Sequence, residues 1–158
     1  LLRNHASDGT KMTVESAFDK YRSFLEGLTV KRVDDLDKFV TKDVLFRDPF
    51  HDVRGTDNMV NIFMNLFEAV HDIQFQVICH AVNGSIVFYH WEFSGVITGR
   101  PRTIDGLTRL VFDQNEMVEE HVEYWDSASQ LYEKMPLIGR LLRYCRWRIS
   151  GGRLFHFH

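Results

Sequence analysis

The chain has 158 residues and a mass of 18.6 kDa, which is the size of one domain. Its hydrophobic content of 44% and charged content of 26% lie near the globular averages and exclude an intrinsically disordered chain. No run approaches about 18 consecutive apolar residues, so the sequence predicts no membrane-spanning helix. The two cysteines, Cys79 and Cys145, fit neither a disulfide framework nor a metal-binding motif, which favours a reduced, cytoplasmic, single-domain protein.

Charge is distributed unevenly along the chain. The net charge is −3, but the segment from Lys134 to the C-terminus contains six basic residues and no acidic one, whereas the first 133 residues contain 13 basic and 22 acidic residues. An acidic body argues against nucleic acid as a partner, because binding to phosphates requires a basic surface.

Apolar periodicity begins after the first 11 residues. Residues 1–11 show no pattern and lack the apolar stretch of a signal peptide, so we expect a disordered extension ahead of a functional start at Met12. From there apolar residues recur every three or four positions, which predicts an amphipathic helix capped by Thr13. Its apolar stripe consists of Val14, Ala17, Phe18, Tyr21, Phe24, Leu25 and Leu28.

Two further helices and a short strand are predicted before residue 71. Leu36, Phe39 and Val40 share one side of a short second helix, and a β-prone run extends from Val44 to Phe50. Thr56 is then expected to cap a third helix. The broad apolar face of this helix comprises Met59, Val60, Ile62, Phe63, Leu66, Phe67 and Val70.

After His71 the apolar period changes from 3.6 to 2, as in β-strands. The dipeptide Asn83-Gly84 that follows is a strong hairpin signal, and Asp126 can cap a closing helix. The residues that alternate in the first strand are Ile73, Phe75, Val77, Cys79 and Ala81. Three more strands are predicted, over Ser85–Val96, Arg102–Phe112 and Met117–Trp125.

Helices first and a meander of strands afterwards predict an α+β fold, with helices on one face of a curved antiparallel or mixed sheet. We expect a cone that wraps around the three N-terminal helices and is open at one end, where a small molecule binds. The expected domain spans residues 12–134. A basic, amphipathic tail over residues 135–158 is expected to form a C-terminal helix.

Several short strings resemble the nuclear transport factor 2-like superfamily, in particular its SnoaL-like and ketosteroid isomerase-like branch. They occur in the same order and cover nearly everything from residue 12 to 126. The strings are Lys20-Tyr21, Asp35-Leu36-Asp37, Asp43–Pro49, Gly55, Thr98–Pro101 and Met117–His121. The resemblance implies the cone-shaped fold and a homodimer that meets through the outer sheet face. It leaves the chemistry open, because this fold serves many functions.

Asp48 is the first candidate for a catalytic residue. Pro49 keeps the backbone of Asp48 extended, and the aromatic neighbours Phe46 and Phe50 favour a desolvated carboxyl, which is a better base near neutral pH. The resemblance makes Asp48 the general base that moves a proton between carbons in ketosteroid isomerases. The alternative is that Asp48 only occupies the turn that ends a strand.

Tyr21 lies on the predicted buried stripe, where its hydroxyl needs a partner. The resemblance makes this hydroxyl the donor to a substrate oxyanion, and a purely structural role in the core is the alternative. Ketosteroid isomerases add a protonated aspartate to the oxyanion site, but the matching position here is Thr108. The missing acid argues against true steroid isomerase activity, because each oxyanion donor contributes several kcal/mol.

Two pairs of ionisable residues lie on the last strands, His90 with Glu92 and His121 with Glu123, each pair on one strand face. By resemblance to limonene epoxide hydrolases, Glu92 and Glu123 match two catalytic aspartates and His90 replaces an arginine, which implies epoxide hydrolysis as an alternative activity. In the opposite interpretation His90 and Glu92 lie outside, and the inner face consists of Val87, Tyr89, Trp91 and Phe93. We expect His121 and Glu123 to face the pocket together with Trp125.

The sequence contains no nucleotide-binding loop, no nucleophile elbow and no close pair of metal ligands, so we expect neither a cofactor nor a metal. The basic tail has the composition of a membrane-surface helix. Peripheral membrane contact is therefore one alternative, but we expect the tail to pack on the cone or on a partner subunit.

The preferred function is acid–base catalysis, of isomerase or cyclase type, on a small hydrophobic molecule that carries oxygen. Asp48 would remove a proton, Tyr21 would bind the oxyanion and His121 would act as a shuttle. A non-catalytic ligand-binding or protein-interaction module is the alternative from a different class. The predicted substrate contacts are Phe24, Phe46, Phe63, Phe67, Thr108 and Trp125.

Overall fold

The structure, a computed structural model, describes residues 7–130, 143–145 and 147, and for residues 7–13 and Ala128 it describes the backbone only. The chain divides into two compact units, residues 1–125 and 126–158. The second unit begins with the short helix α3 (Ser127–Gln130), in which the Asp126 carboxylate accepts a hydrogen bond from the Ser129 amide (3.0 Å), as predicted for a cap. Most of the predicted basic helix lies outside the described residues. Within the described ranges, no helix is long and apolar enough to cross a membrane.

Helix α1 (Ser7–Glu26) is longer than the sequence pattern predicts. It begins at Ser7, so residues 7–11 of the expected extension are helical and Thr13 lies inside the helix rather than at its cap. The second predicted helix is a 3₁₀ helix, η1 (Val30–Lys38), which buries Val33 and Leu36.

Helix α2 (Thr56–Ala69) is capped by Gly55, whose φ of 97° suits glycine, and not by Thr56 as predicted. The Thr56 hydroxyl instead donates to the carbonyl oxygen of Thr41 (3.1 Å). This bond ties the start of α2 to the first strand, where Thr41 lies.

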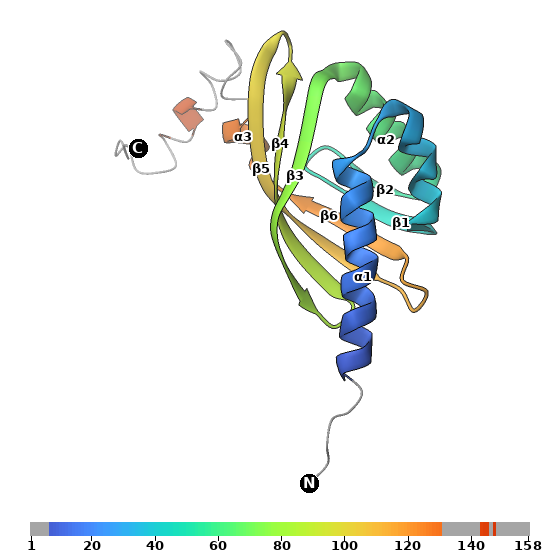
Figure 1. Ribbon diagram of the computed structural model, residues 1–158. Helices are drawn as coiled ribbons and strands as arrows, with labels where there is room; N and C mark the ends of the chain where they lie inside the picture. Colours follow the sequence, from blue (N-terminus) through green and yellow to red (C-terminus); the bar gives the residue numbers. More distant parts are fainter. Residues whose placement is uncertain (1–6, 131–142, 146, 148–158) are drawn as a thin grey trace. The chain divides into compact units, whose positions relative to one another are not determined.

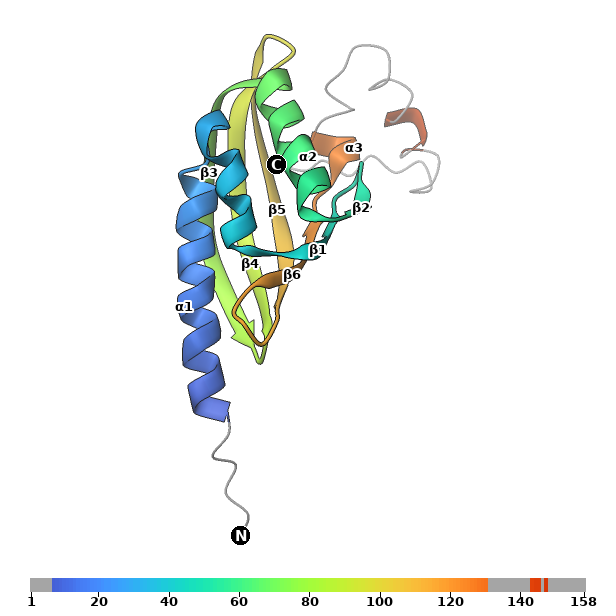
Figure 2. The ribbon, with the colours of Figure 1, turned by 90° about the vertical axis from the view of Figure 1, so that its right-hand side faces the viewer.

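Six strands form one mixed sheet, and the predicted α+β class is confirmed (Figure 1). Their order is β2-β1-β6-β5-β4-β3, and all neighbours are antiparallel except β1 and β6, which are parallel. Figure 2 shows α1 and α2 on the same side of the curved sheet. The strands are β1 (Val40–Arg47), β2 (Asp52–Arg54), β3 (Val70–Asn83), β4 (Ile86–Ile97), β5 (Arg100–Phe112) and β6 (Val118–Tyr124).

A bulge in β3 changes which residues face the helices. Val77 pairs with Trp91 and Cys79 pairs with His90, so Ile78 is the extra residue. The Glu26 carboxylate of α1 accepts a hydrogen bond from the Val77 amide beside this bulge (2.9 Å). Cys79 and Ala81, which the alternation placed with Val77, therefore lie on the opposite face of the sheet.

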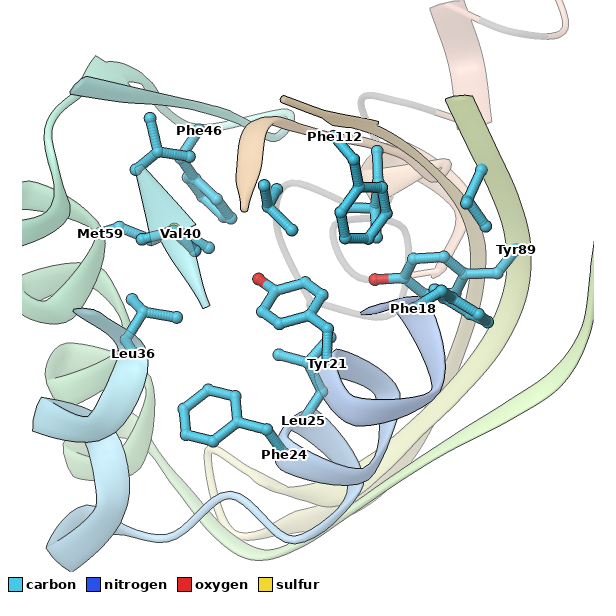
Figure 3. Packing of buried hydrophobic residues seen from close by; sticks show 14 of the residues in the cluster. Phe18, Tyr21, Phe24, Leu25, Leu36, Val40, Phe46, Met59, Tyr89 and Phe112 are labelled. Carbon is cyan, nitrogen blue, oxygen red and sulfur yellow. The ribbon is translucent and has the colours of Figure 1, made fainter. Parts of the chain in front are cut away.

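The core lies between the helices and the inner face of the sheet. Figure 3 shows Phe24 of α1 pointing toward the side of Leu36 in η1, and Tyr21 pointing toward Val40 and Phe46 of β1. Burial of large side chains at this layer removes apolar area from water, which is the main stabilising contribution of the fold. The largest fully buried side chains include Tyr21, Tyr89, Phe18, Phe24, Phe46, Leu36, Met59, Leu110 and His121.

Candidate active site

Three side chains form a hydrogen-bonded chain on the inner face. The Tyr21 hydroxyl of α1 lies 2.9 Å from Nδ1 of His121 in β6. The other ring nitrogen of His121, Nε2, lies 3.2 Å from Oε1 of Glu123. Tyr21 and His121 are both about 1% exposed, whereas the Glu123 side chain is 21% exposed. The chain therefore connects a buried phenol to a carboxylate that reaches solvent.

Burial sets the direction of these hydrogen bonds. It raises the pKa of Tyr21 well above its ordinary value, and the nearby charges of Tyr89 and Glu123 raise it further. The phenol thus stays protonated and can donate to Nδ1 of His121 when that nitrogen carries no hydrogen. The second ring nitrogen of His121, Nε2, then carries the hydrogen and donates to Glu123. This assignment follows from the hydrogen-bond network.

Aromatic side chains surround this chain. Phe46 pairs with His121 in the β1–β6 register, and their ring centroids lie 5.3 Å apart. Phe63 of α2 packs against Phe46 edge-on at 5.9 Å. Of the predicted substrate contacts, Phe24, Phe46, Phe63 and Thr108 are buried, whereas Phe67 and Trp125 are partly buried and pack against the core.

A second polar group lies on the inner faces of β4 and β5. The indole Nε1–H of Trp91 donates to Oγ1 of Thr108 (2.8 Å), and Thr108 is also within hydrogen-bonding reach of the Tyr89 phenol. Burial, followed by the charge of Glu123, raises the pKa of Tyr89 far above its usual value. From the sequence, Tyr89 and Trp91 are predicted only as inner-face residues, in one of two interpretations. Because buried phenol and indole groups need hydrogen-bond partners, this requirement is the sequence signal that points to a polar group at Tyr89 and Trp91.

Asp48 lies in the turn between β1 and β2. Its Oδ1 accepts hydrogen bonds from the amides of Phe50 (2.7 Å) and His51 (2.6 Å), and the His51 ring nitrogen Nδ1 lies 3.0 Å from both carboxylate oxygens. The Asp48 side chain is 11% exposed, and Phe50, expected to desolvate it, is exposed. The carboxylate is thus engaged in its own turn, the role that the sequence left open beside catalysis.

Glu92 and His90 lie on the outer face of the sheet. Tyr89 and Trp91 take the inner face, as the apolar alternation allows, so Glu92 is exposed and faces Asp105 in the β4–β5 register. His90 approaches the same Asp105, with 3.6 Å between Nε2 and Oδ2. The predicted catalytic pair of Glu92 and Glu123 is therefore not brought together, because strand alternation puts the two carboxylates on opposite faces.

The described residues offer two other observations on binding. A shallow pocket of about 290 Å³ is lined by Gln74, Ser94, Thr103 and their neighbours, and it contains none of the predicted site residues. No cluster of three or more His, Cys, Asp or Glu side chains within the described ranges could hold a metal ion.

Helices on one side of a curved mixed sheet, with an ionisable cluster on the inner face, define the class of nuclear transport factor 2-like proteins. A family model narrows this class, because the model of the SnoaL-like domain matches residues 21–121. The chain belongs to this SnoaL-like family. The matched segment begins at Tyr21 and ends at His121, the two residues that meet at 2.9 Å. No curated protein matches the chain significantly.

Solved structures share the fold at low sequence identity. A candidate SnoaL-like polyketide cyclase from Jannaschia sp. CCS1 has a TM-score of 0.67 at 14% identity, over 82% of this chain and 93% of that protein. An LEH-like epoxide hydrolase from M. tuberculosis has a TM-score of 0.62 at 13% identity, over 89% and 98%. A protein of ketosteroid isomerase-like fold from Catenulispora acidiphila, in complex with trimethylamine, has a TM-score of 0.63 at 13% identity, over 73% and 88%.

Proposed function

We propose that this SnoaL-like protein is an acid–base enzyme of isomerase or cyclase type that moves a proton at a carbon next to a carbonyl group. The observation that carries this proposal is the continuous chain from Tyr21 through His121 to Glu123. Such a chain joins a proton acceptor at the solvent side to a hydrogen-bond donor in an apolar interior. Both groups are required when charge moves from a carbon–hydrogen bond to an oxygen.

Glu123 is favoured as the base. Its Oε1 accepts from His121, and within the described part of the chain its second oxygen, Oε2, has no hydrogen-bond partner. Asp48, the first candidate from the sequence, uses Oδ1 for two backbone amides of its own turn. Arg47 pairs with Val122 in the β1–β6 register, so the Asp48 turn and Glu123 belong to the same end of the sheet.

Tyr21 and His121 serve the oxygen of the substrate. While His121 is neutral, Tyr21 donates to its Nδ1. When a solvent proton reaches the imidazole by way of Glu123, which returns to its carboxylate form, Nδ1 becomes a donor to the Tyr21 oxygen, and the phenol hydrogen is then free for a substrate oxygen. His121 thereby acts as the shuttle that the sequence suggested, with Glu123 holding its ring in place.

The reaction that fits these groups is enolisation. Glu123 takes up the proton, the electrons of the carbon–hydrogen bond form the carbon–carbon double bond of an enolate, and the carbonyl π electrons move to the oxygen. Return of the proton to another carbon gives isomerisation, and attack by the enolate carbon within the same molecule gives cyclisation. The aromatic rings around His121, Phe46 and Phe63 among them, favour an apolar substrate.

The test is exchange of carbon-bound hydrogen in heavy water. The full chain is incubated with a panel of apolar β,γ-unsaturated ketones and 1,3-diketones, and deuterium uptake is followed by NMR. Glu123→Gln should slow exchange by about 100-fold or more, the usual contribution of a general base. Glu92→Gln, on the opposite face, is the matched control and should exchange like the wild type.

Two results would contradict the proposal. Exchange that is equal in Glu123→Gln and the wild type would remove Glu123 from the chemistry. Tight binding of these ketones without any exchange would make the protein a carrier, which is the non-catalytic alternative.

A further inference from the structure

The proposed function makes no use of the basic tail. Eleven residues lie between Gly139 and Gly151, and four of them are arginines, while six are aliphatic, aromatic or cysteine. The arginines are Arg140, Arg143, Arg146 and Arg148, and the other six are Leu141, Leu142, Tyr144, Cys145, Trp147 and Ile149. Positive charge and apolar bulk are therefore interleaved over about three helical turns.

The structure describes four residues of this stretch, 143–145 and 147, and all four are helical and exposed. Tyr144 is 59% exposed and Trp147 is 46% exposed. They are three positions apart, which puts them on one side of a helix, and their ring centroids lie 6.0 Å apart. Large apolar rings of this kind gain free energy when a partner removes them from water.

The sequence spacing predicts two different sides for a helix over residues 140–150. The aliphatic side consists of Leu141, Leu142, Cys145 and Ile149, and the opposite side consists of Arg140, Arg143, Tyr144 and Trp147. At a lipid bilayer both sides find suitable surroundings. The aliphatic side enters the boundary of the acyl chains, whereas tryptophan, tyrosine and arginine lie at the level of the headgroups.

Charge selects the kind of membrane. The segment from Lys134 to the C-terminus has six basic residues and no acidic one, whereas acidic residues outnumber basic ones by nine in the first 133 residues. An anionic surface therefore attracts the tail and repels the rest of the chain. A nucleic acid also carries phosphates, but the aliphatic side of the segment has no counterpart there.

We propose that residues 140–150 bind the surface of an anionic lipid membrane. The stretch between Gly139 and Gly151 has eleven residues, which is too short to cross a bilayer, since a spanning helix needs about 20. It lies in the plane of the surface instead, with the arginines on the lipid phosphates. This binding is independent of the proton transfer at Glu123.

The test is co-sedimentation of the full chain with lipid vesicles. The chain should bind vesicles of three parts phosphatidylcholine to one part phosphatidylserine at low salt, be released at high salt, and leave pure phosphatidylcholine unbound. Arg143→Gln should weaken binding about fivefold, which corresponds to about 1 kcal/mol for one basic residue at an anionic surface. Arg54→Gln removes an exposed arginine of β2 and is the matched control, which should not weaken binding.

Trp147 reports on insertion directly. Phosphatidylcholine with brominated acyl chains, mixed into the anionic vesicles, should quench the tryptophan fluorescence of the wild type. Trp147→Phe should abolish this quenching, because the other two tryptophans, Trp91 and Trp125, belong to the first compact unit. Trp147→Ala should weaken binding about tenfold through the loss of buried apolar area, with unchanged urea unfolding of the domain.

Several results would overturn this proposal. One is equal binding, or no binding, to anionic and neutral vesicles, and another is undiminished binding after replacement of all four arginines by glutamine. Single-stranded RNA that displaces the chain from vesicles would assign the segment to nucleic acid. Tail variants that dissociate a dimer, in a wild type that binds no vesicles, would assign it to a second copy of the chain.

The two proposals fail separately. Hydrogen exchange in the ketones without vesicle binding would overturn the membrane contact and leave the proposed function intact. Vesicle binding that depends on Arg143 and Trp147, without hydrogen exchange, would uphold the membrane contact and refute the catalytic function.

Discussion

The two buried phenols make the stability of the protein depend on alkaline pH. Burial raises the pKa of Tyr21 and Tyr89 above the ordinary value near 10. In the unfolded chain both phenols lose their protons near pH 10, while the folded chain keeps them. The folded state then binds more protons, so their contribution is fully present below about pH 10 and is lost as the pH rises further.

The size of the effect follows from the number of buried phenols. Each one lowers the free energy of unfolding by about 1.4 kcal/mol per pH unit above pH 10, so Tyr21 and Tyr89 together give about 2.8 kcal/mol per unit. Since a typical domain has about 5–15 kcal/mol in total, one to two pH units should remove a large part of the stability. Tyr21→Phe and Tyr89→Phe should each halve the slope.

The assay is urea unfolding between about pH 9 and 11, followed by tryptophan fluorescence on the wild type and on each Phe variant. Subtracting the slope of a variant from that of the wild type removes the contribution of lysines and arginines, because all forms share these residues. Tyr144→Phe removes an exposed phenol and should keep the wild-type slope. A wild-type slope in Tyr21→Phe as well would show that this phenol ionises equally in both states, which would refute its burial as a protonated donor.

Two further predictions concern the turn and the outer face. Asp48→Ala removes the acceptor of two backbone amides and should lower the free energy of unfolding in urea by about 1–2 kcal/mol. Asp48→Asn keeps an Oδ1, so it should cost less and should leave hydrogen exchange of the substrate intact. Loss of exchange in a folded Asp48→Asn protein would show that Asp48 is the base. On the outer face, Leu107 and Tyr124 pair across β5 and β6 and are both more than half exposed, so we expect a homodimer there that Leu107→Glu converts to a monomer in sedimentation. A monomeric wild type would contradict this interface.

Local patterns in the sequence predict most of the fold. The period of 2 and the Asn83-Gly84 turn locate β3 and β4 to within a few residues, and the same alternation offers an inner face with Tyr89 and Trp91 as one of its two interpretations. These features depend only on neighbours in the chain. The position of the bulge in β3 depends on a more distant residue, because the Glu26 carboxylate that accepts a hydrogen bond from the Val77 amide comes 51 residues earlier.

For the candidate site, too, the sequence predicts only those features that depend on neighbours in the chain. Tyr21 and His121 were each expected to face inward, but their contact joins residues 100 positions apart, and strand periodicity carries no information on such a distance. For Asp48 the sequence allowed both a turn and an extended carboxylate. The outcome was decided by the amides of Phe50 and His51, whose positions depend on the short strand β2, which the sequence analysis did not predict.

Stability alone gives no reason for this polar interior. Replacing a hydrogen-bonded buried pair by apolar groups of the same shape is often neutral or stabilising, so phenylalanine at Tyr21 and Tyr89, with an apolar residue at His121, would serve a core equally well. Helix α1 and the inner face of the sheet instead place two phenols, an imidazole and a threonine hydroxyl in the core. Only one member of the hydrogen-bonded chain, Glu123, reaches solvent. An arrangement that leads from an accessible carboxylate to buried donors is what proton transfer to and from an apolar substrate requires.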